Sequence, residues 1–425
     1  MRKAAEIIVY WEWLILLLLL PLFWFLEGWL SLILLLIPIF WLLRKLVTGR
    51  FFPASADDIA ILVLMAALLV SVWAVFDIHL SFPKIAGLIM GISLFYAAVQ
   101  HARAAPNGIY FLIGSLFLAG TSLAVIGILA NPANPFFLHL SPILAALPQD
   151  WMNLPQIGAV TVNANEIAGM LCWIVPLLIV VTIGLWPVKS EINHVRIGLI
   201  KWALLAMLLI NSLILLATNS RGGILSVLIS ILVILAIQYR WGRWILLVVV
   251  LIAGMLLVLP GFMNMGLDVQ STILAFDETG LAGRIEIWSR ALYAMREFPI
   301  TGMGMNGFRE LVPVFYPMIL RSPDTDIGHA HNHFLQAGLD LGIPGLIAYL
   351  SLWLISAGLL WQAWRNSSAR FDRLLVLGLS GSLTAGWLFG LLDAISLGAK
   401  PGFLWWLLIA LTVVVGEKVA RNKNA

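Results

Sequence analysis

Long apolar runs fill most of the chain, and short polar segments separate them. Many of these runs approach the twenty residues that an α-helix needs to cross the hydrocarbon core of a bilayer. The short alternating strands of a transmembrane barrel do not occur in the sequence. The fold class is therefore all-α, a polytopic integral membrane protein. The pattern predicts about twelve spans, at residues 10–26, 29–43, 59–76, 85–99, 109–129, 167–186, 197–217, 224–239, 244–260, 334–361, 374–392 and 403–415.

Composition supports a membrane protein and excludes several classes of function. Of the 425 residues, 62% are hydrophobic and only 11% are charged, which is too apolar for a soluble domain. The single cysteine, Cys172, excludes an internal disulfide and a cysteine-based metal site. The basic residues are scattered between the apolar runs, so the formal charge of +4 does not indicate nucleic-acid binding. The N-terminus opens like a signal peptide, but no small-residue cleavage site follows, which predicts a retained first span.

The distribution of basic residues predicts which segments face the cytoplasm. Placing the N-terminus inside puts most of the 25 lysines and arginines on the cytoplasmic side. The residues left outside are Lys84, Arg221, Arg284, Arg290, Arg296, Arg309, Arg321 and Lys400. Five of them lie in one polar segment at about 261–340. The expected regions are N-terminal spans (1–130), central spans (131–260), an extracytoplasmic catalytic loop with short helices (261–333), and C-terminal spans with a basic cytoplasmic tail (334–425).

Two of the outside arginines are candidates for binding an anion. Arg221 lies in the turn NSRGG at 219–223, and no acidic residue occurs between positions 192 and 267. It could reach lipid headgroups, but the two glycines leave room for a ligand, and a guanidinium suits a phosphate. Arg284 lies near the start of a predicted helix at 283–298, without an acidic residue three or four positions away. Arg290 differs, because Glu286 four residues earlier can pair with it.

Three histidines alternate in the segment HAHNH at 329–333, and the sequence leaves three interpretations open. A metal site is the first, although a helix would place only His329 and His333 on one face, and no cysteine or paired carboxylates lie nearby. A polar helix entrance, capped by His331 or Asn332, is the second. A general base is the third, because imidazole can accept a proton from a hydroxyl near neutral pH. A glycine-rich turn at 302–307 follows no strand, so a dinucleotide site is rejected.

An ordered set of motifs resembles the O-antigen ligase and O-antigen polymerase family of bacterial membrane glycosyltransferases. The resemblance covers roughly residues 155–350. One departure is Asp340, where the family usually has a glutamate. The motifs are NANEIAG at 163–169 before a span with Pro176, SRGG at 220–223, GR at 283–284 with Trp288, PITGMG at 299–304, HAHNHFLQ at 329–336 and GIPG at 342–345.

The resemblance implies a reaction and roles for individual residues. Such enzymes, similar in fold to the GT-C class, transfer a glycan from undecaprenyl diphosphate to an acceptor hydroxyl, with inversion and without nucleotide sugar, metal or other cofactor. The acceptor would be lipid A core or another envelope molecule. The reaction would take place on the periplasmic face of the bacterial inner membrane, among membrane lipids. Arg221 and Arg284 match arginines thought to hold the diphosphate, and His331 matches the proposed general base. Further candidates for substrate binding are His329, Asn332, Asn165 and Arg290.

Three functions remain open at this stage. The first is a ligase that transfers a lipid-linked glycan to an envelope acceptor, as in lipopolysaccharide biosynthesis. The second is a polymerase that joins two lipid-linked repeat units of a polysaccharide. The third, from another class, is a transporter or flippase of lipid-linked sugars. A transporter predicts internal repeats and charged residues inside spans, and the sequence shows neither.

Overall fold

The computed structural model describes residues 2–22, 30–130, 163–187, 194–262, 281–319, 326–395 and 397–424. Within these ranges the chain forms helices joined by turns, and no strand occurs there. The all-α fold class is therefore confirmed for the described part of the chain. Residues 131–162, Arg321 and residues 263–280 of the polar segment lie outside the described residues.

A helix coincides with each of the twelve apolar segments that the pattern predicts. The helices are α1 (Arg2–Leu22), α2 (Leu30–Thr48), α3 (Asp58–Trp73), α4 (Ile78–Ala104), α5 (Gly108–Ala130), α8 (Ala164–Leu185), α9 (His194–Ala217), α10 (Arg221–Gln238), α11 (Arg240–Phe262), α15 (His333–Asn366), α16 (Arg370–Leu392) and α17 (Gly402–Asn424). In the described part of the chain, eight are long and apolar enough to cross a membrane: α4, α5, α8, α9, α10, α15, α16 and α17. A multi-pass membrane protein follows, while the count of twelve spans stays a prediction.

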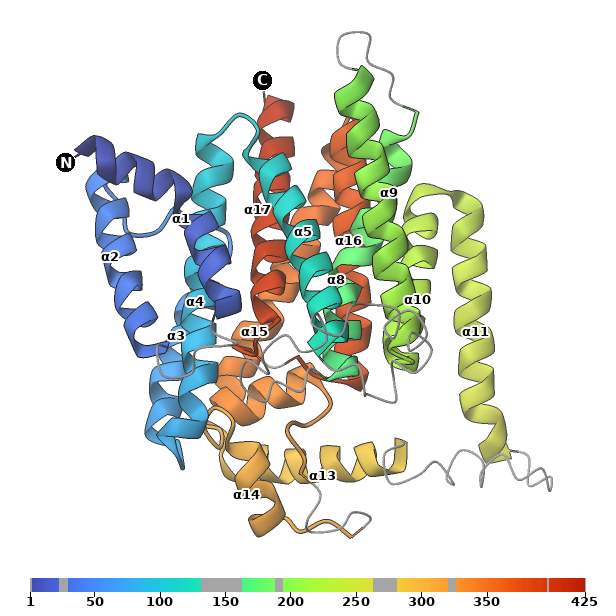
Figure 1. Ribbon diagram of the computed structural model, residues 1–425. Helices are drawn as coiled ribbons and strands as arrows, with labels where there is room; N and C mark the ends of the chain where they lie inside the picture. The colour runs from blue at the N-terminus through green and yellow to red at the C-terminus, as the bar shows by residue number, and fades with distance from the viewer. Residues whose placement is uncertain are drawn as a thin grey trace.

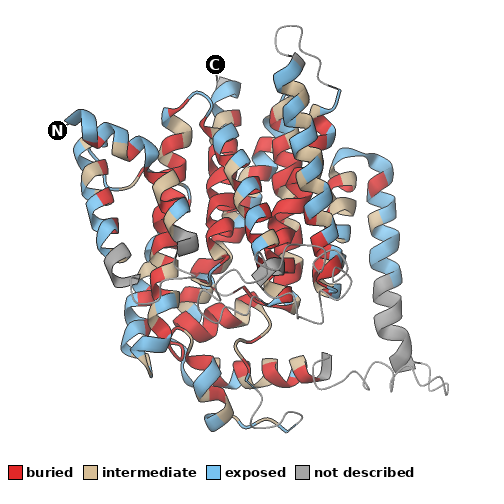
Figure 2. Ribbon diagram, in the orientation of Figure 1, coloured by how far each residue is buried: buried red, intermediate tan, exposed pale blue. Residues whose placement is uncertain are grey.

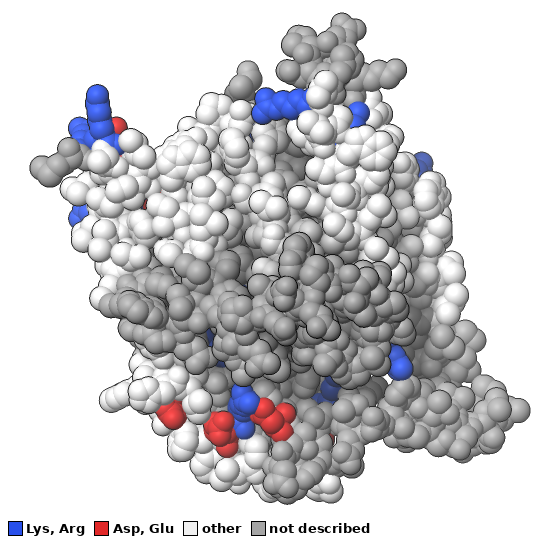
Figure 3. All heavy atoms as spheres, in the orientation of Figure 1, with Lys and Arg blue, Asp and Glu red and all other residues white. Residues whose placement is uncertain are grey.

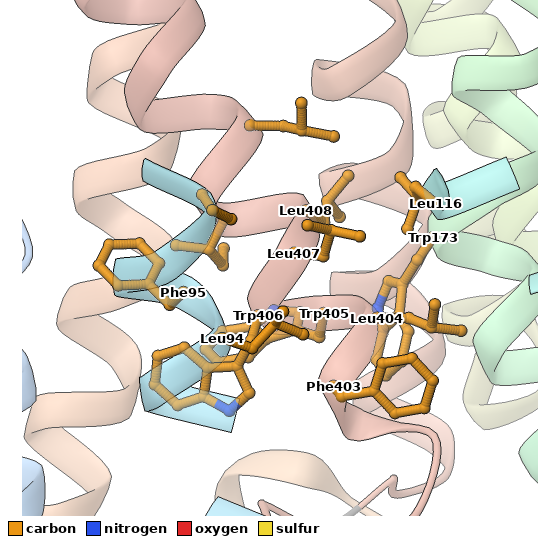
Figure 4. Close-up of a cluster of buried hydrophobic side chains, with 14 of the residues drawn as sticks. Leu94, Phe95, Leu116, Trp173, Phe403, Leu404, Trp405, Trp406, Leu407 and Leu408 are labelled. Atoms are coloured by element: carbon orange, nitrogen blue, oxygen red, sulfur yellow. The ribbon is translucent and has the colours of Figure 1, made fainter. Parts of the chain in front are cut away.

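The core of the bundle is built around α17. Its aromatic residues Trp405 and Trp406 are buried and pack against Phe95 of α4 and Trp173 of α8, as Figure 4 shows. Helices α8 and α16 are likewise mostly buried, whereas α9 and α11 present many exposed apolar side chains (Figure 2). Apolar side chains on the outside of a bundle are expected where lipid replaces water.

One basic residue that the charge count assigned to a connection lies inside the bundle. Arg44 is fully buried in α2, where its guanidinium forms an ion pair with Glu12 of α1 and donates to the carbonyl of Phe51. A buried arginine requires a partner of this kind, because an uncompensated charge is very unfavourable away from water. The pair therefore joins the first two helices.

Two further helices lie across one end of the bundle. They are α13 (Leu281–Glu297) and α14 (Gly307–Phe315), at the bottom of Figure 1, whereas both chain termini lie at the opposite end. The buried side chains of Ile287 and Phe308 pack these helices onto Leu339 of α15 in a second core. On the face drawn in Figure 3, the described charged side chains gather toward the two ends of the bundle, and the region between is mostly uncharged. The polar segment therefore forms a cap on one end.

A kink in α15 holds this cap in place. Gly342 has φ +70° and ψ −178°, which interrupts the helix at the first residue of the GIPG motif. The interruption lets the Ile343 N–H donate to the Pro299 carbonyl (2.7 Å), while the Met303 N–H donates to the Leu339 carbonyl (2.7 Å). The segment that follows α13 is thereby tied to α15 by backbone hydrogen bonds.

We expect Gly342→Ala to loosen this cap. A Cβ at Gly342 would lie 2.2 Å from the Ile300 carbonyl oxygen, and the positive φ is unfavourable for any residue with a Cβ. The strain should reduce stability by roughly 1–3 kcal/mol. Thermal unfolding in detergent measures this, with Gly358→Ala, where a Cβ meets open space, as the control. Equal melting temperatures for the two variants would contradict the role assigned to the kink.

Candidate functional site

Three of the sequence motifs form the capped N-termini of helices. Asn163 caps α8 by accepting from the Asn165 N–H, and Ser220 caps α10 by accepting from the Gly223 N–H. Asn332 caps α15 by accepting from two backbone N–H groups, as one of the sequence alternatives predicted. Helix N-termini carry partial positive charge and free N–H groups, so they favour nearby anions. The motifs are thus local start signals as well as candidate ligand contacts.

Close packing brings these N-termini to the end of α16. Gly223 of α10 faces the Ala168 methyl group of α8, and Gly222 faces Leu392, the last residue of α16. Gly390 packs against the imidazole of His333, the first residue of α15. Residues far apart in the sequence therefore meet at one end of the bundle, the end that α13 crosses (Figure 1).

Asp393, directly after α16, is the centre of the polar cluster. Its Oδ1 accepts a hydrogen bond from His331 Nδ1 at 3.0 Å. Burial alone would raise the pKa of Asp393, but the His331 hydrogen bond, the two neighbouring imidazoles and the Ala394 N–H outweigh burial and hold this pKa at about 2. The side chain is therefore a carboxylate at neutral pH and can only accept. His331 Nδ1 is therefore the donor, and in the neutral ring this leaves the lone pair on Nε2.

The backbone of His331 is itself unusual. Its φ of +47° is in the left-handed region, which residues other than glycine adopt rarely. Its N–H donates to His329 Nδ1 at 3.2 Å, and its ring donates to Asp393. Strained backbone held by surrounding contacts is common at functional sites. The side chain is partly exposed, at 22%, so a ligand can reach the imidazole.

His329 and His333 have different roles from His331. Burial, together with the neighbouring His331, lowers the pKa of His329 to about 3, so His329 is neutral near pH 7. Its Nδ1 is already an acceptor, which leaves Nε2–H as a donor. His333 accepts from the Ile395 N–H through Nε2, so its Nδ1 donates to the Tyr349 hydroxyl. His333 is buried, and hydrogen bonds occupy both of its ring nitrogens, so it connects α15 to the segment after α16.

Arg284 reaches the same carboxylate from α13. Its guanidinium lies 3.8 Å from Asp393 Oδ2, which is too long for a hydrogen bond. The sequence shows no acidic residue three or four positions from Arg284, but this applies only to its own helix. Asp393, from another part of the chain, lies near it. Arg290 instead has local partners, because it donates to the Pro317 carbonyl at 3.1 Å and lies 3.6 Å from Glu286. Substrate binding by Arg290 stays a prediction that these contacts do not favour.

The remaining candidates surround the cluster. Arg221 is exposed at the first position of α10, beside the end of α16. Asn165 lies in the first turn of α8 and is half-buried. The Asn332 amide donates to the Leu391 carbonyl at 3.1 Å, which fixes the histidine segment to α16. The structure thus assembles the predicted residues at one end of the bundle.

The sequence argument against a metal ion requires correction. It assumed that His329 and His333 share a helix face and that no carboxylate is near. The structure instead brings the rings of His329 and His331 within 4.4 Å and adds Asp393, so that ligand atoms of all three lie within 4.8 Å of one another. Such a set could hold a metal ion, but the Nδ1 atoms of both histidines are already engaged in hydrogen bonds. This pattern favours an oriented base.

A comparison with known protein families matches a region that contains several residues of this site. Residues 204–350 match the family described as O-antigen ligase. This region belongs to the O-antigen ligase family. The comparison with curated proteins gives no match. The O-antigen ligase region contains Arg221, Arg284, His329, His331 and Asn332, whereas Asn165 and Asp393 lie outside it. Membership supports an enzyme of the ligase or polymerase type.

Sequence reasoning gave no role to two residues that organise the candidate site. Asp393 directly follows the predicted span at 374–392, and only the topology, which brings this position to the same end as the histidines, could have suggested it. Gln336 is buried in α15, where its Oε1 accepts from the Ala330 N–H and its Nε2 donates to Asp340, each at 2.8 Å. The backbone between His329 and His331 is thereby fixed.

We expect Asp393→Asn to impair the candidate site without unfolding it. An amide can donate to His331 Nδ1 and so favour the wrong tautomer, and glycan transfer should fall on the order of 100-fold or more. Initial rates of glycan transfer by the two proteins, together with their melting temperatures, measure this effect. An unchanged rate would contradict the orienting role of Asp393.

Proposed function

We propose that this protein transfers a glycan from undecaprenyl diphosphate to an acceptor hydroxyl on the outer face of the bacterial inner membrane. The acceptor is lipid A core or another envelope molecule, and the anomeric carbon is inverted. The observation that carries the proposal is the His331–Asp393 hydrogen bond beside Arg284. His331 and Arg284 both lie in the region that matches the O-antigen ligase family. The site therefore combines a general base, His331, with arginine side chains that bind the diphosphate.

His331 acts as the general base in this proposal. Its Nε2 lone pair accepts the proton of the acceptor hydroxyl, and the oxygen attacks the anomeric carbon from the side opposite the diphosphate. A single displacement of this kind inverts the configuration. Asp393 holds the ring and stabilises the imidazolium that forms, as a carboxylate does in other base–orienter pairs. His329 Nε2–H, Asn165 and Asn332 are available as polar contacts for the glycan or the acceptor.

The arginines act on the leaving group. As the glycosidic bond breaks, negative charge increases on the diphosphate, and a preorganised guanidinium stabilises that charge. Arg284 has donors that Asp393 does not use, because the closest approach is 3.8 Å. Arg221 adds a second guanidinium at the N-terminus of α10, where the helix dipole also favours an anion. No nucleotide sugar is required, since the carrier lipid supplies the leaving group.

A polymerase that joins two lipid-linked repeat units uses the same chemistry and differs only in its acceptor. A purified-protein assay with one lipid-linked donor separates the two functions. Transfer to lipid A core in the absence of a second lipid-linked unit supports the ligase. Product that forms only when a second lipid-linked unit is supplied supports the polymerase.

The transporter alternative is tested in the same system. A flippase moves the intact lipid-linked glycan between leaflets and forms no new glycosidic bond. Translocation without product by protein in vesicles would contradict the proposed transfer. A metal-independent reaction is also expected, because His331 and the arginines supply the base and the charge. Loss of transfer in EDTA that Mg²⁺, Mn²⁺ or Zn²⁺ restores would contradict this part of the proposal.

A further inference from the structure

Lys84 is a buried cation for which neither the sequence motifs nor the proposed reaction provides a role. It lies in the second turn of α4, at the end of the bundle that α13 and α14 cover (Figure 1). Its Nζ is inaccessible to solvent and has no hydrogen-bond partner among the described residues. A buried ammonium without a partner is highly unfavourable, so such a group within a membrane protein indicates a binding site.

Contacts from two directions fix Lys84 beside the polar cluster. The loop that follows Asp393 packs on α4, where a Cβ at Gly398 would collide with the Lys84 carbonyl oxygen. From the other side, the Asn306 amide donates to the carbonyl of Leu80, one turn before Lys84, at 3.1 Å. The Asn306 N–H in turn donates to Asp340 at 3.2 Å. The base of the Lys84 side chain is therefore held between the Asp393 loop and the cap.

Two carboxyl groups lie near Lys84, but neither forms a hydrogen bond with its ammonium. The ammonium acts electrostatically on Glu166 of α8, on Asp340 of α15 and on His329. Asp340 Oδ2 is also buried without a hydrogen-bond partner among the described residues, and no hydrogen bond joins it to Lys84. His329 is neutral and offers Lys84 no counter-charge. An anionic ligand that enters beside His329 would supply the missing partner.

We propose that Lys84 is a third cation of the donor site and binds a phosphate oxygen of the lipid diphosphate. The inference rests on the proposed function. Lys84 approaches from α4, whereas Arg284 and Arg221 approach from α13 and α10, so the diphosphate is held from three helices. A compact ammonium with three donors suits a single phosphate oxygen. Because the ammonium is buried, it contributes most when the donor has displaced water from the site.

Binding of undecaprenyl diphosphate to the purified full-length protein, without acceptor, tests this role. Lys84→Met should weaken binding on the order of 10- to 100-fold, because a charge-assisted hydrogen bond is lost. Lys84→Arg should retain part of the affinity, and neutral undecaprenol should bind both variants and the wild type equally. Lys3→Met removes an exposed cation from α1, at the opposite end of the bundle, and is the matched control, with unchanged affinity expected.

Other outcomes overturn the inference. If Lys84 only balances Asp340, then Lys84→Met lowers the melting temperature, the added change Asp340→Asn restores it, and diphosphate affinity stays at the wild-type value. A wild-type protein that does not bind undecaprenyl diphosphate also contradicts the role of Lys84. Wild-type protein that binds the diphosphate through Lys84 but transfers no glycan contradicts the proposed function and supports the role of Lys84.

Discussion

Replacing His331 with asparagine should reduce glycan transfer by about 10²–10⁴-fold, the contribution typical of a general base. Asparagine tolerates the left-handed backbone that this position adopts and can still donate to Asp393, but it cannot accept the proton of an acceptor hydroxyl. The fold and the contact with α16 should therefore persist. Initial rates with purified protein in nanodiscs, at saturating donor, measure the change in kcat.

Two controls separate loss of the base from loss of structure. His79→Asn changes an exposed histidine of α4 and should leave the rate unchanged. Donor binding by His331→Asn should equal that of the wild type, since the base acts on the acceptor. A variant that folds, binds donor and retains more than a tenth of the rate would show that another group removes the proton.

Replacing Arg284 with alanine should produce the second large effect, a loss on the order of 100- to 1000-fold in kcat/KM for the donor. The guanidinium lies beside Asp393 but forms no hydrogen bond to it, so its main contribution is to the leaving diphosphate. Arg284→Lys should give an intermediate rate, because an ammonium keeps the charge and loses the planar pair of donors. Kinetics at varied donor concentration distinguish the three proteins.

A variant of a second arginine on α13 tests whether the effect depends on the position of Arg284 or only on its positive charge. Arg296 is exposed in the last turn of α13, so Arg296→Ala should leave donor kinetics unchanged. The Arg284→Ala protein must also keep the wild-type melting temperature. Equal losses for Arg284→Ala and Arg296→Ala would indicate that α13 contributes only general electrostatic attraction, and would contradict a specific contact.

Local signals explain why most of the fold could be predicted. Apolar runs define helices because the hydrocarbon core permits no other backbone that satisfies its own hydrogen bonds, and each predicted segment coincides with a helix. The Gly342 kink and the Asn332 cap were also predictable, because each depends on the chemistry of one residue. The ion pair of Arg44 was not predictable, because its partner, Glu12, lies on another helix.

The site was only partly predictable because its contacts join distant segments. Motif chemistry selected Arg284 and His331 as candidates, but Asp393, which lies near both, comes 62 residues after His331. A helical interpretation of HAHNH misplaced His329, since α15 begins only at His333. Lys84 lacked any local signal and became a candidate only when its burial was known. The spacing of residues along one sequence does not show which residues of different helices contact each other in a bundle.

The most direct test of the central claim measures both products of one reaction. Purified wild-type protein in nanodiscs receives a defined glycan on undecaprenyl diphosphate together with an acceptor lipid, in the presence of EDTA. We predict that free undecaprenyl diphosphate and the glycan–acceptor product appear in equal amounts, that the new glycosidic bond has the inverted configuration, and that His331→Asn forms neither. Lipid-linked glycan that stays intact while wild-type protein moves it across the bilayer would contradict the account.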